Sequence, residues 1–293
     1  MDISVIGKHW KSSSFQPDLE SLANLQRRMF LARAVRYAVG ITTIAALPLY
    51  IMEHTSAAQI AADDLRIRSE RVALDADWGK LACYFTRPNA DTGRLPGVII
   101  SHDKWGLTPH FEDVARRLAL EGFVALAPDY ASRFGGTPTE SGPALEVVGM
   151  VTKADMDADT QAALLWLKSN GKSSEKVGAV GFGLGATAID AAVTKEPALN
   201  GAVIFYGHPP PLADVGNIKA PLMLNLAGKD QFVGPEVPAF VDAVKKANVK
   251  AEIFTYENTE RGFDDDSDSA HYSAEAAKLA WSRTIEFLKA TLS

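Results

Sequence analysis

The sequence predicts an α/β fold, with a mostly parallel, twisted sheet covered by helices on both faces. Three observations support this prediction. Apolar, strand-like segments alternate with amphipathic helical segments from about residue 63 to the C-terminus, which is the pattern of repeated strand–helix–strand units. Apolar residues make up 47% of the 293 residues, enough for a large core. Glycine, proline and other turn-forming residues separate the segments. There is no internal repeat, so we expect one large domain.

Seven segments are predicted to be strands. The continuous apolar run at 97–101 is typical of a strand that is buried on both faces. The other predicted strands are residues 81–85, 123–127, 176–181, 202–206, 221–227 and 251–256. Such short runs, bounded by turn residues, fit the strands of a buried sheet.

Five segments are predicted to be helices. The first begins with Thr108 as N-cap and Pro109 at the first helical position, and Gly122 ends it. The others are residues 155–168, 184–194, 235–247 and 273–292. Residues 130–150 contain several glycines and prolines, and we expect a long loop or a small lid there.

The N-terminal segment 1–58 is predicted to be an export signal or a membrane anchor rather than part of the domain, which leaves 59–293 as the folded unit. Arg27 and Arg28 precede Phe30 and an apolar stretch at 34–52, a pattern that resembles a bacterial twin-arginine export signal. Small residues at 55–58 suit signal cleavage. An uncleaved inner-membrane anchor and a helix of the domain are the alternatives. The expected location is periplasmic, with any membrane contact made only through this segment.

Composition excludes some classes of partner. The net charge is −6, whereas binding of nucleic acid needs concentrated basic residues, so no nucleic-acid partner is expected. The single cysteine, Cys83, cannot form an intrachain disulfide and is expected to be a small buried side chain. Nothing in the sequence calls for a cofactor.

Long segments resemble the dienelactone hydrolase family. They include 101–107, with Ser-His-Asp-Lys-Trp-Gly-Leu, and 122–129, with Gly-Phe-Val-Ala-Leu-Ala-Pro-Asp. Segments 112–119, 176–182, 221–224 and 276–288 match as well. The resemblance covers residues 63–293 in order and implies an α/β-hydrolase fold with a Cys-His-Asp triad. It also implies a strand-to-helix elbow of the form G-x-C-x-G that carries the nucleophile.

The resemblance places two unusual residues in that triad. The elbow reads Gly181-Phe182-Gly183-Leu184-Gly185, so Gly183 stands at the position of the nucleophile and has no side chain to attack a substrate. Asp230 matches the triad acid. Arg261 stands at the position of the histidine, and arginine stays protonated, so it cannot act as a general base. An ion pair between Arg261 and Asp230 is our hypothesis for what replaces the histidine–aspartate dyad.

Other residues are expected around the pocket. Asp103 takes the place of a family glutamate, and Asp265 takes the place of a substrate-binding arginine. The backbone amides of Lys104 and Leu184 match the family's oxyanion hole. His102 and His208 are expected to line the pocket, although a lone histidine is more often structural.

Three alternative sites are not favoured by the sequence. Gly181, Gly183 and Ala186 fit a dinucleotide-binding pattern only weakly, because the next strand does not end in an acid. The acidic run 264–268 lacks the glycine and the terminal glutamate of an EF-hand loop, so a solvated loop and no metal site are expected. Thr187 and Ser101 are expected to pack in the fold rather than to attack a substrate.

Two functions remain open. In the first, the protein is an exported, non-catalytic relative of dienelactone hydrolase that binds a small ester, lactone or carboxylate-like ligand, or a protein. In the second, it is an ester or lactone hydrolase that uses a non-standard nucleophile, or a water activated by His102 or Asp103. The lack of an activated nucleophile beside a base favours the first.

Overall fold

The computed structural model describes residues 59–90, 93–195 and 199–293. The predicted export signal or anchor at 1–58 lies outside the described residues. Within the described part, every helix is too short or too polar to cross a membrane.

Eight strands form a single mixed sheet in the order β1-β2-β4-β3-β5-β6-β7-β8. Their bounds are β1 Ile67–Ala76, β2 Gly79–Pro88, β3 Leu95–Ser101, β4 Val124–Pro128, β5 Ser173–Phe182, β6 Gly201–Phe205, β7 Leu222–Ala227 and β8 Ala251–Tyr256. The pairs β1–β2 and β2–β4 are antiparallel, and all the other pairs are parallel. The prediction of a mostly parallel sheet is confirmed.

Strand β1 was not predicted from the sequence. It pairs with β2 along its whole length, from Ile67 opposite Pro88 to Ala76 opposite Gly79. Most of its side chains are exposed or half-buried, because the strand lies at the edge of the sheet. Its residues therefore lack the apolar run by which the central strands were recognised.

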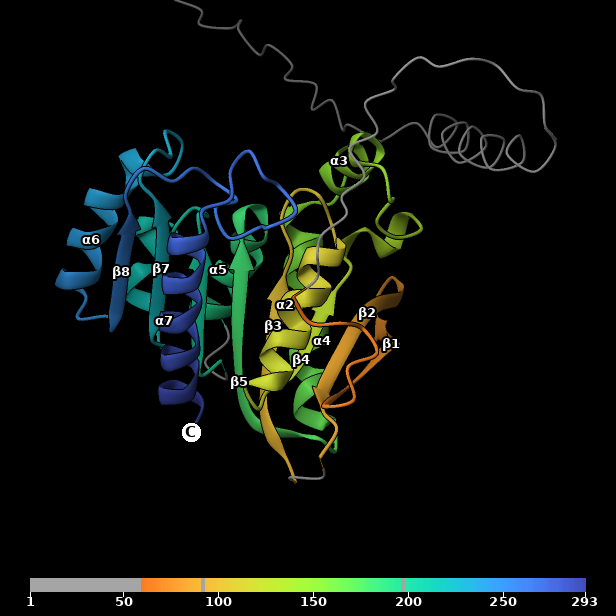
Figure 1. Ribbon diagram of the computed structural model, residues 1–293. Coiled ribbons are helices and arrows are strands. Elements are labelled where there is room, and N and C mark those ends of the chain that lie inside the picture. Colours follow the sequence, from red (N-terminus) through yellow and green to blue (C-terminus); the bar gives the residue numbers. More distant parts are fainter. Residues whose placement is uncertain (1–58, 91–92, 196–198) are drawn as a thin grey trace, which may run out of the picture. The chain divides into compact units, whose positions relative to one another are not determined.

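Helices cover both faces of the sheet (Figure 1). They are α2 Pro109–Leu120, α3 Ser141–Gly149, α4 Lys153–Ser169, α5 Ala186–Lys195, α6 Val237–Lys246 and α7 Ala274–Leu292. Side chains of α2 and α7 pack into one apolar core, and side chains of α4, α5 and α6 pack into a second core on the opposite face. Each face of the sheet is thus shielded from water, as a parallel sheet requires.

The segment 130–150 is more regular than the predicted loop. It contains the 3-10 turn Tyr130–Phe134 and helix α3, whose Ala144, Val147 and Val148 are buried. The turn is capped by Asp129, which accepts a hydrogen bond from the amide of Ala131 at 3.1 Å. Glycine and proline are helix breakers in general, but Gly142 and Pro143 lie in the first turn of α3, where proline costs little.

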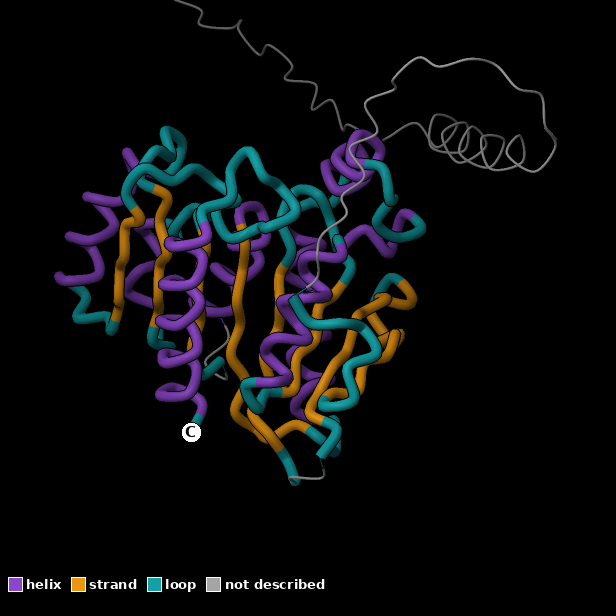
Figure 2. Tube along the Cα trace, viewed as in Figure 1, coloured by secondary structure: helices purple, strands orange, loops and turns teal. Residues whose placement is uncertain are grey.

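The carboxyl ends of the parallel strands meet along one edge of the sheet. Figure 2 shows the loops that follow these strands gathered at that edge. Asp103 follows β3, Gly183 follows β5, Tyr206 follows β6 and Asp230 follows β7. In open α/β sheets this edge is where ligands bind, so the topology alone brings the predicted site residues Asp103, Gly183 and Asp230 together.

Candidate functional site

The turn after β5 is a sharp elbow built around Gly183 and Gly185. Gly183 has φ +51°, in the left-handed region that glycine adopts at little cost. A Cβ atom at Gly185 would lie 2.3 Å from the carbonyl oxygens of Ser101 and His102, whereas a Cβ at Gly183 would have no atom nearer than 3.5 Å. Gly185 is therefore needed for close packing, while the space beside Gly183 has room for a side chain. A short 3-10 turn, Gly183–Gly185, precedes α5, so the helix begins two residues later than predicted.

Arg261 and Asp230 face each other beside this elbow. Arg261 Nη1 lies 3.3 Å from Asp230 Oδ2. The other carboxylate oxygen of Asp230 accepts hydrogen bonds from the amides of Phe232 and Val233. Arg261 Nη2 would lie 3.6 Å from a Cβ at Gly183. The guanidinium thus occupies the space in front of the elbow, and only one of its N–H groups faces Asp230.

A cavity of about 940 Å³ opens over these residues. Gly183, Asp230 and Arg261 all line it, together with Trp105 and Phe232. The Phe232 side chain is 74% exposed, so the rim offers an apolar surface next to the guanidinium. A cavity lined by a guanidinium and aromatic side chains can bind a small ligand that has an anionic group and an apolar body.

Asp103 lines the cavity on the side of β3. Its Oδ1 accepts a hydrogen bond from the amide of Trp105 at 2.8 Å. Burial raises the pKa of this carboxyl group to about 7, although the Trp105 amide and the nearby His110 oppose the shift. Its Cβ lies 3.5 Å from the position of a Cβ at Gly183. A carboxyl group that titrates near neutrality therefore lies next to the elbow.

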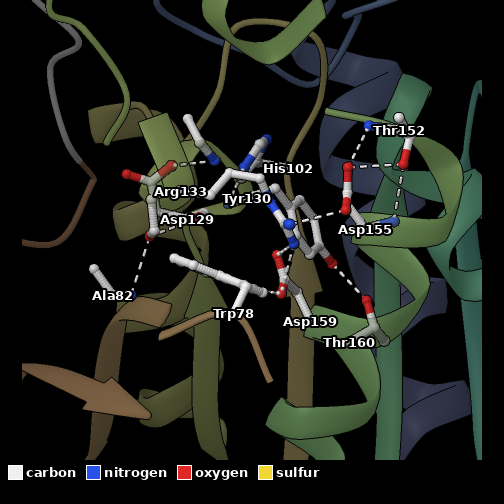
Figure 3. A network of polar contacts seen from close by, with 12 residues as sticks. Trp78, Ala82, His102, Asp129, Tyr130, Arg133, Thr152, Asp155, Asp159 and Thr160 are labelled. Carbon is white, nitrogen blue, oxygen red and sulfur yellow. Dashed lines mark hydrogen bonds and ion pairs between the residues drawn. The ribbon is translucent and has the colours of Figure 1, made fainter. Parts of the chain in front are cut away.

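His102 is turned away from the cavity, contrary to the prediction that it lines the pocket. Its ring is buried, with Nδ1 donating to the carbonyl oxygen of Asp103 at 2.8 Å and Nε2 accepting from the amide of Tyr130 at 3.2 Å (Figure 3). Burial lowers its pKa, which favours the neutral ring. These two bonds hold the backbone of the loop after β3, so His102 has a structural position.

The remaining predicted pocket residues lie at the cavity. Lys104, Leu184 and His208 all line it, and His208 Nδ1 lies 3.0 Å from Glu236 Oε2. Thr187 also lines the cavity, whereas packing against the sheet was expected. Its hydroxyl donates to the carbonyl oxygen of Leu184 at 2.8 Å.

Tyr206 was missed by the sequence analysis. It lines the cavity directly after β6 and has φ +38°, an uncommon conformation for a residue with a side chain. Its hydroxyl donates to Asp264 Oδ1 at 2.7 Å. Burial and the charge of Asp264 raise its pKa well above the usual value, so the phenol stays protonated. A tyrosine that ends a buried apolar strand carries no sequence signal that separates it from the core.

The acidic run after β8 is not a solvated loop, as was expected. Asp264 is buried, and Asp265 and Asp266 are half-buried. They lie around the buried ring of His110, the second residue of α2, which the sequence analysis had also missed. Periodicity placed His110 on a helix but gave no indication that the acidic residues reach it.

Comparisons with known proteins agree with this architecture. The family model "Dienelactone hydrolase family" matches residues 81–292. A carboxymethylenebutenolidase-like protein of Salmonella typhi is 30% identical over 223 residues, which is 71% of this chain and 82% of the relative. The protein usf of Aquifex pyrophilus is 33% identical over 206 residues, covering 68% of this chain and 89% of the relative.

Solved structures show the same fold. A dienelactone hydrolase-like protein of Klebsiella pneumoniae superposes with a TM-score of 0.70 at 26% identity, over 76% of this chain and 98% of the other. The expected α/β-hydrolase fold is thereby confirmed. The match of the family model over most of the chain shows that this protein belongs to the dienelactone hydrolase family.

Proposed function

We propose that this protein is a non-catalytic member of its family that binds a small anionic ligand in the cavity over the elbow. One observation carries the proposal: the guanidinium of Arg261 lies where an attacking side chain and its base would have to meet, in front of Gly183. Acyl transfer requires an activated nucleophile beside a base. A glycine and a permanently charged arginine supply neither.

The ion pair supports binding rather than catalysis. Asp230 is buried, with 2% of its side chain exposed, whereas Arg261 is 34% exposed to the cavity. The remaining N–H groups of the guanidinium can donate to a carboxylate, and guanidinium–carboxylate pairs are often bidentate. Asp230 holds the guanidinium in place through one contact, and the exposed part of Arg261 stays open to the anionic group of a ligand.

Binding is tested with carboxymethylenebutenolide, the compound in the names of the relatives. We expect calorimetry to show saturable binding without turnover, and Arg261→Met to weaken binding at least about tenfold because a charge-assisted contact is lost. Lys229→Met is the matched control, since Lys229 is an exposed cation that also lines the cavity. Hydrolysis of the butenolide or of p-nitrophenyl acetate by the native protein contradicts the proposal, as does unchanged binding by Arg261→Met.

A gain-of-function variant shows whether the protein lacks only the triad residues or whether the rest of the site has changed as well. The double variant Gly183→Cys, Arg261→His restores the residue types of the family triad, and a Cβ at position 183 meets only ordinary contacts. We expect measurable ester hydrolysis from this variant and none from Gly183→Cys alone, which lacks the base. A double variant that folds and stays silent shows that the rest of the site no longer supports the chemistry.

Asp103 favours a second candidate function, hydrolysis by an activated water. A carboxyl group with a pKa of about 7 is suited to general-base catalysis at neutral pH. If Asp103 activates a water, the rate of hydrolysis by the native protein should rise with pH through about 7. This hydrolysis should disappear in Asp103→Asn. If native turnover persists in Asp103→Asn, the water-activation candidate fails as well.

Export is part of the proposal. The twin arginine at Arg27-Arg28 and the apolar stretch that follows support it. We expect a bacterial host to deliver the chain to the periplasm, and an Arg27→Lys, Arg28→Lys variant to remain inside. Equal fractionation of the two chains contradicts a twin-arginine route.

A further inference from the structure

We propose a binding site for one divalent transition-metal ion, Zn²⁺ or Mn²⁺, formed by His110 at the start of α2 and by Asp265 and Asp266 in the loop after β8. One ligand atom from each of these residues lies within 4.8 Å of the others. One imidazole and two carboxylates form a mixed nitrogen and oxygen donor set, which these ions accept. The site is separate from the proposed ligand contact at Arg261 and does not depend on it.

The separation between His110 and Asp265 matches a ligand shell better than a hydrogen bond. His110 Nδ1 lies 3.3 Å from Asp265 Oδ1, whereas a charge-assisted hydrogen bond is about 2.7–2.9 Å long. Two ligand atoms that are each about 2.1 Å from one ion are about 3.0–3.4 Å apart in octahedral or tetrahedral geometry. Asp265 Oδ1 is also fixed by the amide and hydroxyl of Ser267 at 2.9 and 2.5 Å.

His110 provides a second, independent observation. Its side chain is only 3% exposed, and its Nε2 has no hydrogen-bond partner among the described residues. A buried polar nitrogen without a hydrogen bond is costly, and at Nε2 the ring has only a 3.5 Å ion-pair contact with Asp264. A cation at Nδ1 would neutralise the adjacent carboxylates and keep the proton of the neutral ring on Nε2, which faces Asp264.

The groups around the His110 ring are arranged like the residues that orient a metal-binding histidine. Nε2 faces Asp264 Oδ2 at 3.5 Å, and Tyr206 fixes the other oxygen of Asp264 at 2.7 Å. Histidine ligands commonly direct their second nitrogen toward a carboxylate that orients the ring. On the other side, Gln59 Nε2 donates to Asp266 Oδ2 at 3.2 Å, which leaves Oδ1 of Asp266 for the ion.

An ion here would tie α2 to the loop that carries Arg261, next to the cavity that Asp265 also lines. The competing state is metal-free, with a doubly protonated His110 between the carboxylates. Burial opposes that charge, but Asp264, Asp265 and Asp103 together raise the pKa of His110 to about 9. In the metal-free state the cluster should not bind added metal tightly, whereas the proposed site should.

The test uses the full chain, stripped with a chelator and titrated with Zn²⁺ and Mn²⁺ by calorimetry. We expect one equivalent of at least one of the two ions to bind with micromolar or tighter affinity and to raise the melting temperature by several degrees. Co²⁺ in the same site should give visible absorption bands that report a nitrogen ligand.

Variants decide where the ion binds. Asp266→Asn and His110→Gln should abolish the high-affinity equivalent, and Asp264→Asn should weaken it about 10–100-fold as an outer-shell residue. Asp266→Asn is the main variant, because Asp266 is half-buried and its amide substitute should fold. His271→Ala is the control, since His271 lies near Asp268 and Glu260 in a more exposed cluster; it should retain the equivalent. Absence of a tight equivalent in the native chain overturns the proposal, and so does a tight equivalent that survives Asp266→Asn or is lost in His271→Ala.

Discussion

Among single residues, Gly183 and Gly185 differ in what the fold requires of them. A side chain at Gly183 meets only ordinary contacts, so Gly183→Ala should cost about 1 kcal/mol of unfolding free energy for its left-handed backbone. A Cβ at Gly185 would overlap two backbone carbonyl oxygens, which cannot move cheaply. Gly185→Ala should therefore lose more than about 3 kcal/mol or fail to fold. Urea denaturation of both variants measures this difference, and similar losses would show that the elbow is not built as described.

The buried carboxyl group of Asp190 should make the stability of the protein depend on pH. Burial raises its pKa from 3.8 to about 8, the charge of Lys153 opposes the shift, and Asp157 and Asp214 add to it. The folded chain therefore holds a proton that the unfolded chain releases above about pH 4, so stability falls as pH rises from about 4 to 8. Compared with Asp190→Asn, the native protein should lose at least about 1 kcal/mol more between pH 5 and pH 9. Equal losses in denaturant titrations at the two pH values would contradict this assignment.

The site shows which residues a sequence can reveal. Gly183, Asp230 and Arg261 could be placed because the resemblance to the family assigns each of them a position after a predicted strand. Tyr206 and His110 could not, because their roles arise from contacts with Asp264, which is 58 residues from Tyr206 in the chain. His102 was misplaced for a related reason: its position after β3 is correct, but the direction of its ring is set by the distant amide of Tyr130.

At the level of elements, a polar network joins the β1–β2 turn, the 3-10 turn after β4 and helix α4 (Figure 3). Asp159 on α4 is fully buried and accepts hydrogen bonds from Trp78 at 2.7 Å and from Arg133 at 3.0 Å. Arg133 also lies over the Trp78 ring, 4.6 Å from its centroid. This network fixes the edge hairpin that the sequence did not predict, which explains how a largely exposed strand keeps its place.

Removing the cation of this network should be costly. Arg133→Met leaves Asp159 buried without its counter-charge, and we expect a loss of about 3 kcal/mol. Lys80→Met is the control, because the pair between Lys80 and Asp75 is exposed and should contribute less than about 0.5 kcal/mol. Denaturation midpoints compared at one pH give both values. A loss for Arg133→Met as small as that of the control would mean that solvent reaches Asp159.

For the molecule as a whole, the sequence predicted the parallel part of the sheet well and the β1 edge poorly. Strands β3 to β7 are mostly apolar because helices cover both of their faces, and this burial is visible in the residues themselves. β1 and α3 depend on contacts with distant segments, so periodicity gave no sign of them. The same division applies to the site, where topology sets which residues meet and packing sets how they are oriented.

The proposed domain boundary between residues 58 and 59 can be tested with shortened chains. Both backbone polar groups of Ile60 are hydrogen-bonded. Its amide donates to Asp113 Oδ1 at 2.8 Å, and its carbonyl oxygen accepts from Arg116 Nε at 2.7 Å. Both charged partners have 4% of their side chains exposed. A chain of residues 59–293 should therefore unfold with the same free energy as the full chain, within about 0.5 kcal/mol.

A chain of residues 65–293 lacks Ile60, so Asp113 and Arg116 each lose one hydrogen bond. Arg116 keeps its contacts with Tyr84, Glu112 and Asp113. Hydrogen bonds to charged groups contribute about 1.5–3 kcal/mol each, so we expect this chain to lose at least about 2 kcal/mol. Denaturant titration of the three chains measures both steps. If the 59–293 chain is already destabilised, residues before 59 belong to the folded unit. If the 65–293 chain is as stable as the full chain, the boundary lies further along the sequence.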